Sequence, residues 1–257
     1  YEYSVLNQAT AVWRGTWAAP SIRAQFAYGP DGGRYRRIDD GSTLGGTTAT
    51  TYIGSVERRV LPGGAVQWRR SVAGVLIEHS GESISGGITR AAAASTERHQ
   101  FTDPQGTVQV IGSISGSSVT VLERLDTNAN GEWRTPNPPF GQAGSSHTTR
   151  GFTGHEHAEG LDTIHMNGRL YWASGGRMVQ PDPILTEPLN PQNWNPYSYV
   201  VNNPLNLTDP SGYSFMSILT MTAMTLAINN ASKGPIRSLM RALGPNVTGI
   251  TIGVGCS

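Results

Sequence analysis

The sequence has very few cysteines, few charged residues and almost no lysine. Cys256 is the only cysteine among 257 residues, so neither an intrachain disulfide nor a zinc site built on several cysteines can form. Charged residues make up 14% of the chain, against about 25% in an average domain, and Lys233 is the only lysine. The formal net charge of +1 gives no strong electrostatic case for nucleic acid or an anionic membrane as partner.

The chain also lacks a targeting segment at its start and a long apolar run. Its first ten residues, YEYSVLNQAT, contain neither a basic nor an apolar signal-peptide region. They resemble internal sequence, so we expect a C-terminal fragment of a longer protein. The apolar run 215–228 is shorter than the ~20 residues that a membrane-spanning helix needs. A buried or interfacial helix and a membrane-inserting segment both remain open for it.

Glycine and turn-forming dipeptides are abundant. The chain has 32 glycines, and short apolar or aromatic runs alternate with Gly, Pro-Asp and Asn-Gly turns throughout residues 1–150. The stretch FAYGPDGGRYRRIDDG is typical of a hairpin around a Pro-Asp-Gly-Gly turn. Turns at this spacing, without a useful 3.6-residue apolar period, predict an all-β fold.

Three of these stretches resemble one another. YGPDGGRYRRID, TDPQGTVQVI and LDTNANGEWR each place Asp or Asn before a glycine and follow it with Arg- or Val-rich sequence. A repeat of 20 to 40 residues is typical of stacked hairpins that cannot bury an apolar face alone. We therefore expect the hairpins to stack on one another.

The composition changes abruptly after Tyr213. Residues 214–257 are rich in Met, Leu and Thr with helical spacing, so a short helical tail is expected. They contain no histidine and no carboxylate, which excludes a hydrolase or nuclease built from this segment alone.

Residues 151–213 carry the most specific motifs. The stretch resembles the RHS repeat-associated core domain that closes RHS/YD-repeat proteins, and the looser hairpin pattern upstream is similar to YD repeats, so the resemblance covers roughly residues 1–213. The matching elements are Phe152-Thr153-Gly154-His155-Glu156, Asn167-Gly168-Arg169-Leu170-Tyr171, Asp182-Pro183, Asn195-Pro196-Tyr197-Ser198-Tyr199, Asn202-Asn203-Pro204 and Asp209-Pro210-Ser211-Gly212-Tyr213. The chain departs from the family pattern at Ile164-His165-Met166, Trp172-Ala173 and Tyr213.

The resemblance implies a division of labour along the chain. Residues 1–149 would form part of a curled YD-repeat β-shell, residues 150–213 a self-cleaving core that closes it, and residues 214–257 the start of an enclosed toxin. The implied partners are the upstream shell, the chain's own passenger, an immunity protein, and a secretion apparatus or chaperone. The implied setting is a bacterial effector, secreted or delivered (for example by type VI secretion) in interbacterial competition. No cofactor is implied.

The same resemblance implies an aspartic self-protease that cuts after a Pro-x4-Asp-Pro-x-Gly-x motif. Pro204 and Asp209 have that spacing, with Pro210 and Gly212 completing the motif, so the implied scissile bond is Tyr213–Ser214.

The residues themselves allow this chemistry. Peptide hydrolysis by carboxylates needs two of them close enough to share a proton, and Asp182 and Asp209 meet only if the proline-rich loop between them doubles back. Arg177 is expected to orient one of the carboxylates through an ion pair. Gly212 would remove side-chain crowding next to the scissile bond.

Three alternatives stay open. Both aspartates can be turn-formers, because Asp-Pro-x-Gly is common turn chemistry. Ser214 can attack the preceding peptide bond by an N→O acyl shift, which needs no pair of carboxylates. The whole unit can also be a non-catalytic plug, with residues 214–257 acting as a membrane-active toxin segment.

Two metal-like patterns are weak. His155-Glu156-His157, with His165 downstream, places two imidazoles on one face of a strand. Asp126, Asn128 and Asn130 match half of a calcium loop, but Asn137 occupies the position of the bidentate glutamate. We therefore predict no metal site.

Overall fold

The computed structural model describes residues 1–42, 44–72, 74–85, 87–134, 147–158, 160–183 and 189–213, and the backbone of 216–217. The prediction of an all-β fold is confirmed. Within these ranges the helical segments are short 3-10 turns, at Pro62–Gly64 (η1), Phe152–Gly154 (η2), Pro191–Trp194 (η3) and Val200–Asn202 (η4). Most of the predicted helical tail lies outside the described residues.

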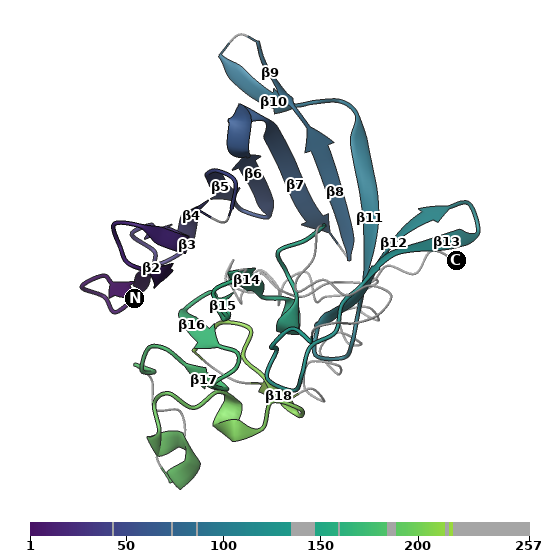
Figure 1. Cartoon of the computed structure of the whole chain (residues 1–257). Helices are drawn as coiled ribbons and strands as arrows, with labels where there is room; N and C mark the ends of the chain where they lie inside the picture. The colour runs from purple at the N-terminus through teal and green to yellow at the C-terminus, as the bar shows by residue number, and fades with distance from the viewer. Residues whose placement is uncertain are drawn as a thin grey trace, which may run out of the picture.

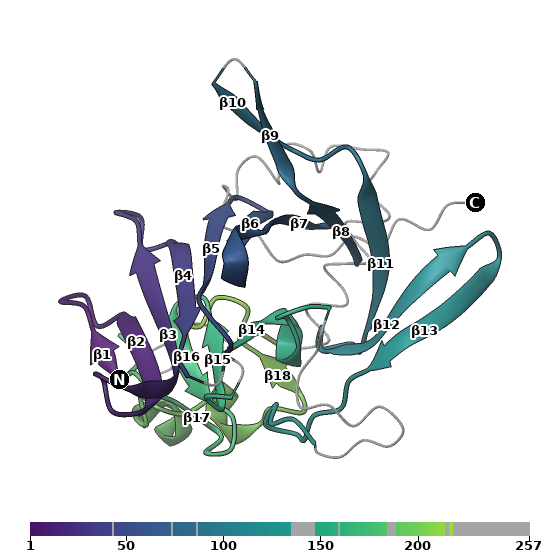
Figure 2. The same cartoon turned by 45° about the horizontal axis from the view of Figure 1, so that its top comes forward.

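An eleven-stranded antiparallel sheet dominates the molecule. Figures 1 and 2 show it curving so that its strands surround one side of the remaining chain. Its strands, in spatial order, are β1 (Glu2–Tyr3), β2 (Ala9–Gly15), β3 (Pro20–Tyr28), β4 (Arg34–Asp40), β5 (Thr48–Ile53), β6 (Val56–Val60), β7 (Val66–Val72), β8 (Val75–Ser80), β11 (Ser95–Thr102), β12 (Val108–Ser115) and β13 (Ser118–Arg124).

The three similar sequence stretches form the same five-residue turn. In each turn the first amide donates to the fifth carbonyl, and the fourth amide donates to the first carbonyl. The fourth residue has a positive φ, which glycine adopts without strain. These turns span 29–33, 103–107 and 128–132, with φ values of +77° at Gly32, +85° at Gly106 and +81° at Gly131.

One hairpin leaves the sheet. Strands β9 (Glu82–Ser85) and β10 (Ile88–Ala91) pair with each other and project from the sheet between β8 and β11 (Figures 1 and 2). The base of the hairpin is held by Arg58 Nε, which donates to Glu82 at 2.8 Å, and by Trp68 Nε1, which donates to the same carboxylate at 3.2 Å.

A second, four-stranded sheet lies against one end of the main sheet. It consists of β14 (Glu156–Ala158), β15 (Thr163–Met166), β16 (Arg169–Trp172) and β17 (Arg177–Met178). Beside it, β18 (Leu207–Thr208) pairs with β19 (Met216–Ser217). These two residues of the predicted helical tail are therefore in a strand, because the backbone of β18 supplies their hydrogen-bond partners.

Two apolar cores hold the second sheet in place. One lies between the sheets and joins Ala24 and Phe26 of β3 to Leu170 of β16. The other lies within residues 152–207, where the rings of Tyr171 and Tyr199 are 4.6 Å apart between centroids. Ile164 and Met166, two of the positions that depart from the motif pattern considered above, are both fully buried in this second core. Burial of the apolar surface in the first core is the main driving force for the contact between the two sheets.

Candidate functional site

The predicted cleavage site is centred on the turn formed by residues 209–213, which we call the Asp209 turn. Asp209 is buried, and its Oδ1 accepts hydrogen bonds from the amides of Gly212 at 2.9 Å and Tyr213 at 3.1 Å, as well as from Ser211. Asp103 does the same in the 103–107 turn, where its Oδ1 accepts from Gln105 N and Thr107 N, both at 2.9 Å. The Oδ1 atom of Asp209 therefore supports a turn, which is one of the alternatives that the sequence left open.

The Asp209 turn is pressed against the connection between β15 and β16. Gly212 has a φ of +77°, and a Cβ atom there would overlap the carbonyl oxygen of Met166 and lie 2.8 Å from the amide of Gly168. Gly168 N donates to Ser211 O at 2.9 Å, and Tyr213 Oη donates to Gly168 O at 3.1 Å. Only glycine at position 212 permits this approach.

Arg169 joins the two predicted catalytic carboxylates. Its side chain is buried on β16, and its Nη2 lies 3.0 Å from Asp182 Oδ2 and 3.4 Å from Asp209 Oδ2. Arg169 Nε also donates to the carbonyl oxygen of Gly212, and Nη1 donates to Pro196 O at 3.3 Å. One guanidinium thus links both aspartates to the backbone just before Tyr213.

The expected role of Arg177 needs correction. Arg177 is exposed on β17, where its backbone pairs with Trp172, and the ion pairs to Asp182 and Asp209 come from Arg169. The physical reason is position. β16 follows the Asn-Gly turn on which Gly212 rests, whereas β17 is the edge strand of its sheet.

The two carboxylates differ in their surroundings. The Asp209 side chain is 4% exposed and has several donors at Oδ1, which suits an ionised carboxylate that only accepts. The Asp182 side chain is 19% exposed, and its amide donates to Pro196 O at 2.8 Å. Asp182 is therefore the member of the pair that water can reach.

The prolines of the motif are held through their carbonyl groups. Pro204 O accepts from the side chain of Gln105, in the turn between β11 and β12. Pro210 O accepts from Asn167 Nδ2 at 2.9 Å and contacts His155 Nε2 at 3.3 Å. Ser214, the residue after the predicted scissile bond, lies outside the described residues.

The buried histidines make contacts within the protein. His155 Nδ1 contacts Thr153 Oγ1 at 2.8 Å, His157 Nε2 accepts from Phe152 N at 3.0 Å, and His165 Nε2 contacts Tyr28 Oη at 3.0 Å. Burial lowers the pKa of His155 to about 4 and that of His157 to about 3. Within the described ranges, no group of three or more His, Cys, Asp or Glu side chains is arranged to hold a metal ion.

The half-match to a calcium loop has a structural use of its own. Asn128 Oδ1 accepts from Asn130 N at 2.9 Å and from Glu132 N at 3.1 Å. These bonds are the same as those that Asp103 makes in its own turn. Asparagine therefore supports this turn as aspartate does.

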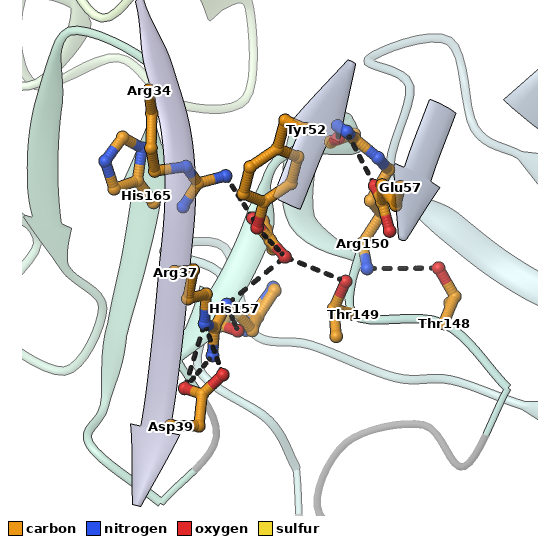
Figure 3. Close-up of polar contacts among 12 residues, drawn as sticks. Arg34, Arg37, Asp39, Tyr52, Glu57, Thr148, Thr149, Arg150, His157 and His165 are labelled. Atoms are coloured by element: carbon orange, nitrogen blue, oxygen red, sulfur yellow. Dashed lines mark hydrogen bonds and ion pairs between the residues drawn. The ribbon is translucent and has the colours of Figure 1, made fainter. Parts of the chain in front are cut away.

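A second polar site, the Glu156 cluster, joins the two sheets and was not predicted. We define it as Glu156 with Arg34, Arg37, Tyr52 and Thr149. Figure 3 shows Arg34 and Arg37 pointing from β4, and Tyr52 from its neighbouring strand, toward a common point near Thr149. Glu156 there forms an ion pair with Arg34, lies 3.3 Å from Arg37 Nη1, and accepts from Tyr52 Oη at 2.9 and 2.8 Å.

The cluster keeps a fully buried carboxylate ionised. Burial alone would raise the pKa of Glu156, but the guanidinium charges of Arg34, Arg37 and Arg150 and the Tyr52 hydroxyl hold it well below its usual range. No sequence signal could have identified the cluster, because its members on the main sheet precede Glu156 by about a hundred residues and no local pattern connects them.

No described helix has the length and apolar character needed to cross a membrane. The apolar run 215–228 lies outside the described side chains, so the question raised for it stays open.

The sequence matches no protein-family model and no curated protein. The fold is similar to part of the crystal structures of TcdB2-TccC3-Cdc42 and TcdB2-TccC3, each with a TM-score of 0.62 and 20% identity. A structure of TcdB2-TccC3 without its hypervariable C-terminal region gives a TM-score of 0.61. Each match covers 82% of this chain and 10% of the other, so the chain spans about a tenth of the proteins it resembles. At this identity the likeness shows the fold.

Proposed function

We propose that the chain is the C-terminal part of an RHS-family toxin, whose β-shell encloses the segment after Tyr213 and whose core cuts the Tyr213–Ser214 bond. The observation that carries the proposal is the contact of one guanidinium with both carboxylates: Arg169 Nη2 lies 3.0 Å from Asp182 and 3.4 Å from Asp209. The positive charge of the arginine offsets the repulsion between two carboxylates at such close range.

The proposed reaction is hydrolysis of a peptide bond. A water oxygen adds to the carbonyl carbon of Tyr213 while a carboxylate accepts one proton from that water. The same proton then passes to the nitrogen of Ser214 as the amine leaves. We assign this exchange to Asp182 because its side chain is partly exposed. Asp209 fixes the turn through Oδ1, and through Oδ2 it pairs with Arg169, which also donates to the carbonyl oxygen of Gly212. The proposed reaction therefore needs the charge of Asp209 as well as its turn.

The comparison supports the architectural half of the proposal. The chain shares its fold with part of TcdB2-TccC3, which has a C-terminal region described as hypervariable. In this chain the change in composition after Tyr213 lies directly beyond the Asp209 turn. A shell with an exchangeable passenger fits both observations. The same proposal includes delivery of the toxin from a bacterium. It also includes an immunity protein and a secretion apparatus or chaperone as partners.

The direct test is the mass of the purified protein. We expect a fragment that ends at Tyr213 and a second fragment whose first residue, by N-terminal sequencing, is Ser214. Asp209→Asn and Asp182→Asn should each leave the folded chain intact. Asp103→Asn is the matched control, because it changes the same turn position on the main sheet and should not alter cleavage.

A non-catalytic plug is the competing function. It is favoured by the fact that Asp103 supports a turn of the main sheet in the same way, and no chemistry is proposed for that turn. A folded wild-type chain that stays at full length would support the plug and overturn self-cleavage. Loss of cleavage in Ser214→Ala, with both aspartates in place, would instead support the N→O acyl shift.

A further inference from the structure

His155 and Glu156, at the start of strand β14, make contacts on opposite sides of the chain. His155 has an extended backbone (φ −84°, ψ 162°) and immediately precedes Glu156, the first residue of β14. Consecutive side chains on an extended chain point to opposite sides. Here one side chain faces the main sheet and the other faces the Asp209 turn.

The Glu156 side depends on the main sheet. Its carboxylate is 3% exposed, and the charged and hydroxyl partners Arg34, Arg37 and Tyr52 come from strands β4 and β5. A buried carboxylate without its counter-charges is strongly destabilising. β14 therefore adopts this position only when β4 and β5 are in place.

The His155 side holds the Asp209 turn. Thr153 Oγ1 lies 2.8 Å from His155 Nδ1, and its hydroxyl can donate there. The neutral ring then carries its proton at Nε2, which faces the carbonyl oxygen of Pro210 at 3.3 Å. This donor and Asn167 Nδ2 fix the peptide group between Pro210 and Ser211, inside the Asp209 turn.

We infer that β14 makes self-cleavage conditional on docking of the core against the shell. Glu156 can be buried in its place only when Arg34 and Arg37 are there to pair with it. His155, the residue before it in the chain, is the positioning residue that then holds the Asp209 turn through Pro210 O. This inference rests on the proposed self-cleavage and deepens it, because it restricts release of the passenger to chains in which these shell strands have folded.

The first test does not depend on cleavage. In the uncleavable Asp209→Asn chain, we expect Glu156→Gln to raise hydrogen exchange at the amides of Gly212 and Tyr213 by about tenfold or more. Glu78→Gln is the matched control, because Glu78 is also buried and pairs with Arg69 at 2.7 Å, but its partners Arg69, Arg98 and Gln67 all lie on the main sheet. Equal exchange in both variants would overturn the coupling.

The second test follows cleavage in the intact chain. His155→Leu removes the donor to Pro210 O and should slow cleavage by about tenfold or more, while His155→Gln, whose amide replaces that donor, should restore most of the rate. Equal rates in the two variants, with both folded by circular dichroism, would remove His155 from the inference. A wild-type chain that never cleaves would refute the proposed function, and the exchange experiment would still decide the coupling.

Discussion

Asp209 uses its two carboxylate oxygens for different purposes. Oδ1 builds the turn, as the corresponding oxygens of Asp103 and Asn128 do, whereas Oδ2 contacts Arg169. Because Asn128 already supports the same turn, Asp209→Asn removes charge while it preserves the backbone. The variant therefore separates the turn role from the proposed catalytic role more cleanly than alanine would.

Arg169 and Arg177 offer a second comparison at the level of single residues. Arg169 contacts two carboxylates and two carbonyl groups through three different nitrogens, which a lysine ammonium cannot reproduce. We expect Arg169→Lys to abolish or greatly slow the release of the fragment that starts at Ser214, as measured by mass spectrometry. Arg177→Lys, on an exposed position, should cleave like wild type, and a defect there would contradict the assignment of Arg169.

Gly212 should be far more sensitive to substitution than a glycine with positive φ that has open space around it. Gly212→Ala places a methyl group on the Met166 carbonyl, so the Asp209 turn must shift away from β15 and β16. Gly116→Ala is the control, because Gly116 has a φ of +60° with open space around its Cβ, and should cost only about 1–2 kcal/mol. Urea unfolding should show a clearly larger loss for Gly212→Ala, and equal losses would contradict the tight packing.

At the scale of elements, the hairpins could be predicted from local sequence. The way in which residues 150–213 pack against the main sheet could not. The turns 29–33, 103–107 and 128–132 each require a positive φ at a glycine, and glycine between apolar runs is visible in any sequence. Asp182 and Asp209 could also be selected as a pair, through the family resemblance. Arg169 could not be selected as their partner from the sequence, because strand order decides which arginine faces the turn.

The Glu156 cluster gives a prediction about how the elements dock. Tyr52→Phe removes a buried hydroxyl that donates to Glu156 at 2.9 and 2.8 Å, and should lower the free energy of unfolding by about 1–3 kcal/mol. Tyr35→Phe, on the exposed face of β4, is the control and should change it little. Urea titrations monitored by tryptophan fluorescence measure both values, and a silent Tyr52→Phe would argue that the cluster does not hold the sheets together.

At the scale of the whole molecule, residues 155–165 bury several groups that respond to acid. His155, His157 and His165 are all buried, and burial lowers the pKa of each below its usual value. Glu156, on β14, is held ionised by arginines. Protonation of a histidine adds a positive charge to this buried region, and protonation of Glu156 leaves the arginine charges beside it uncompensated.

We therefore expect stability to fall on acidification. The unfolded histidines bind protons below about pH 6.5, while His155 and His157 stay neutral in the folded chain until about pH 4 and pH 3. The unfolded state thus binds more protons in this window, so stability is present above pH 6.5 and is lost as the pH falls toward the folded pKa values. The shift at His155 alone corresponds to roughly 3 kcal/mol.

Urea unfolding at a series of pH values tests this account. The midpoint should fall steadily from pH 6.5 to pH 4, and the fall should continue below about pH 4.5, where the carboxylate of Glu156 binds a proton in the unfolded chain but not yet in the folded one. His155→Gln should flatten the upper part of the curve, because its side chain does not titrate. A midpoint independent of pH between 6.5 and 4 would contradict the burial of these histidines in their neutral form.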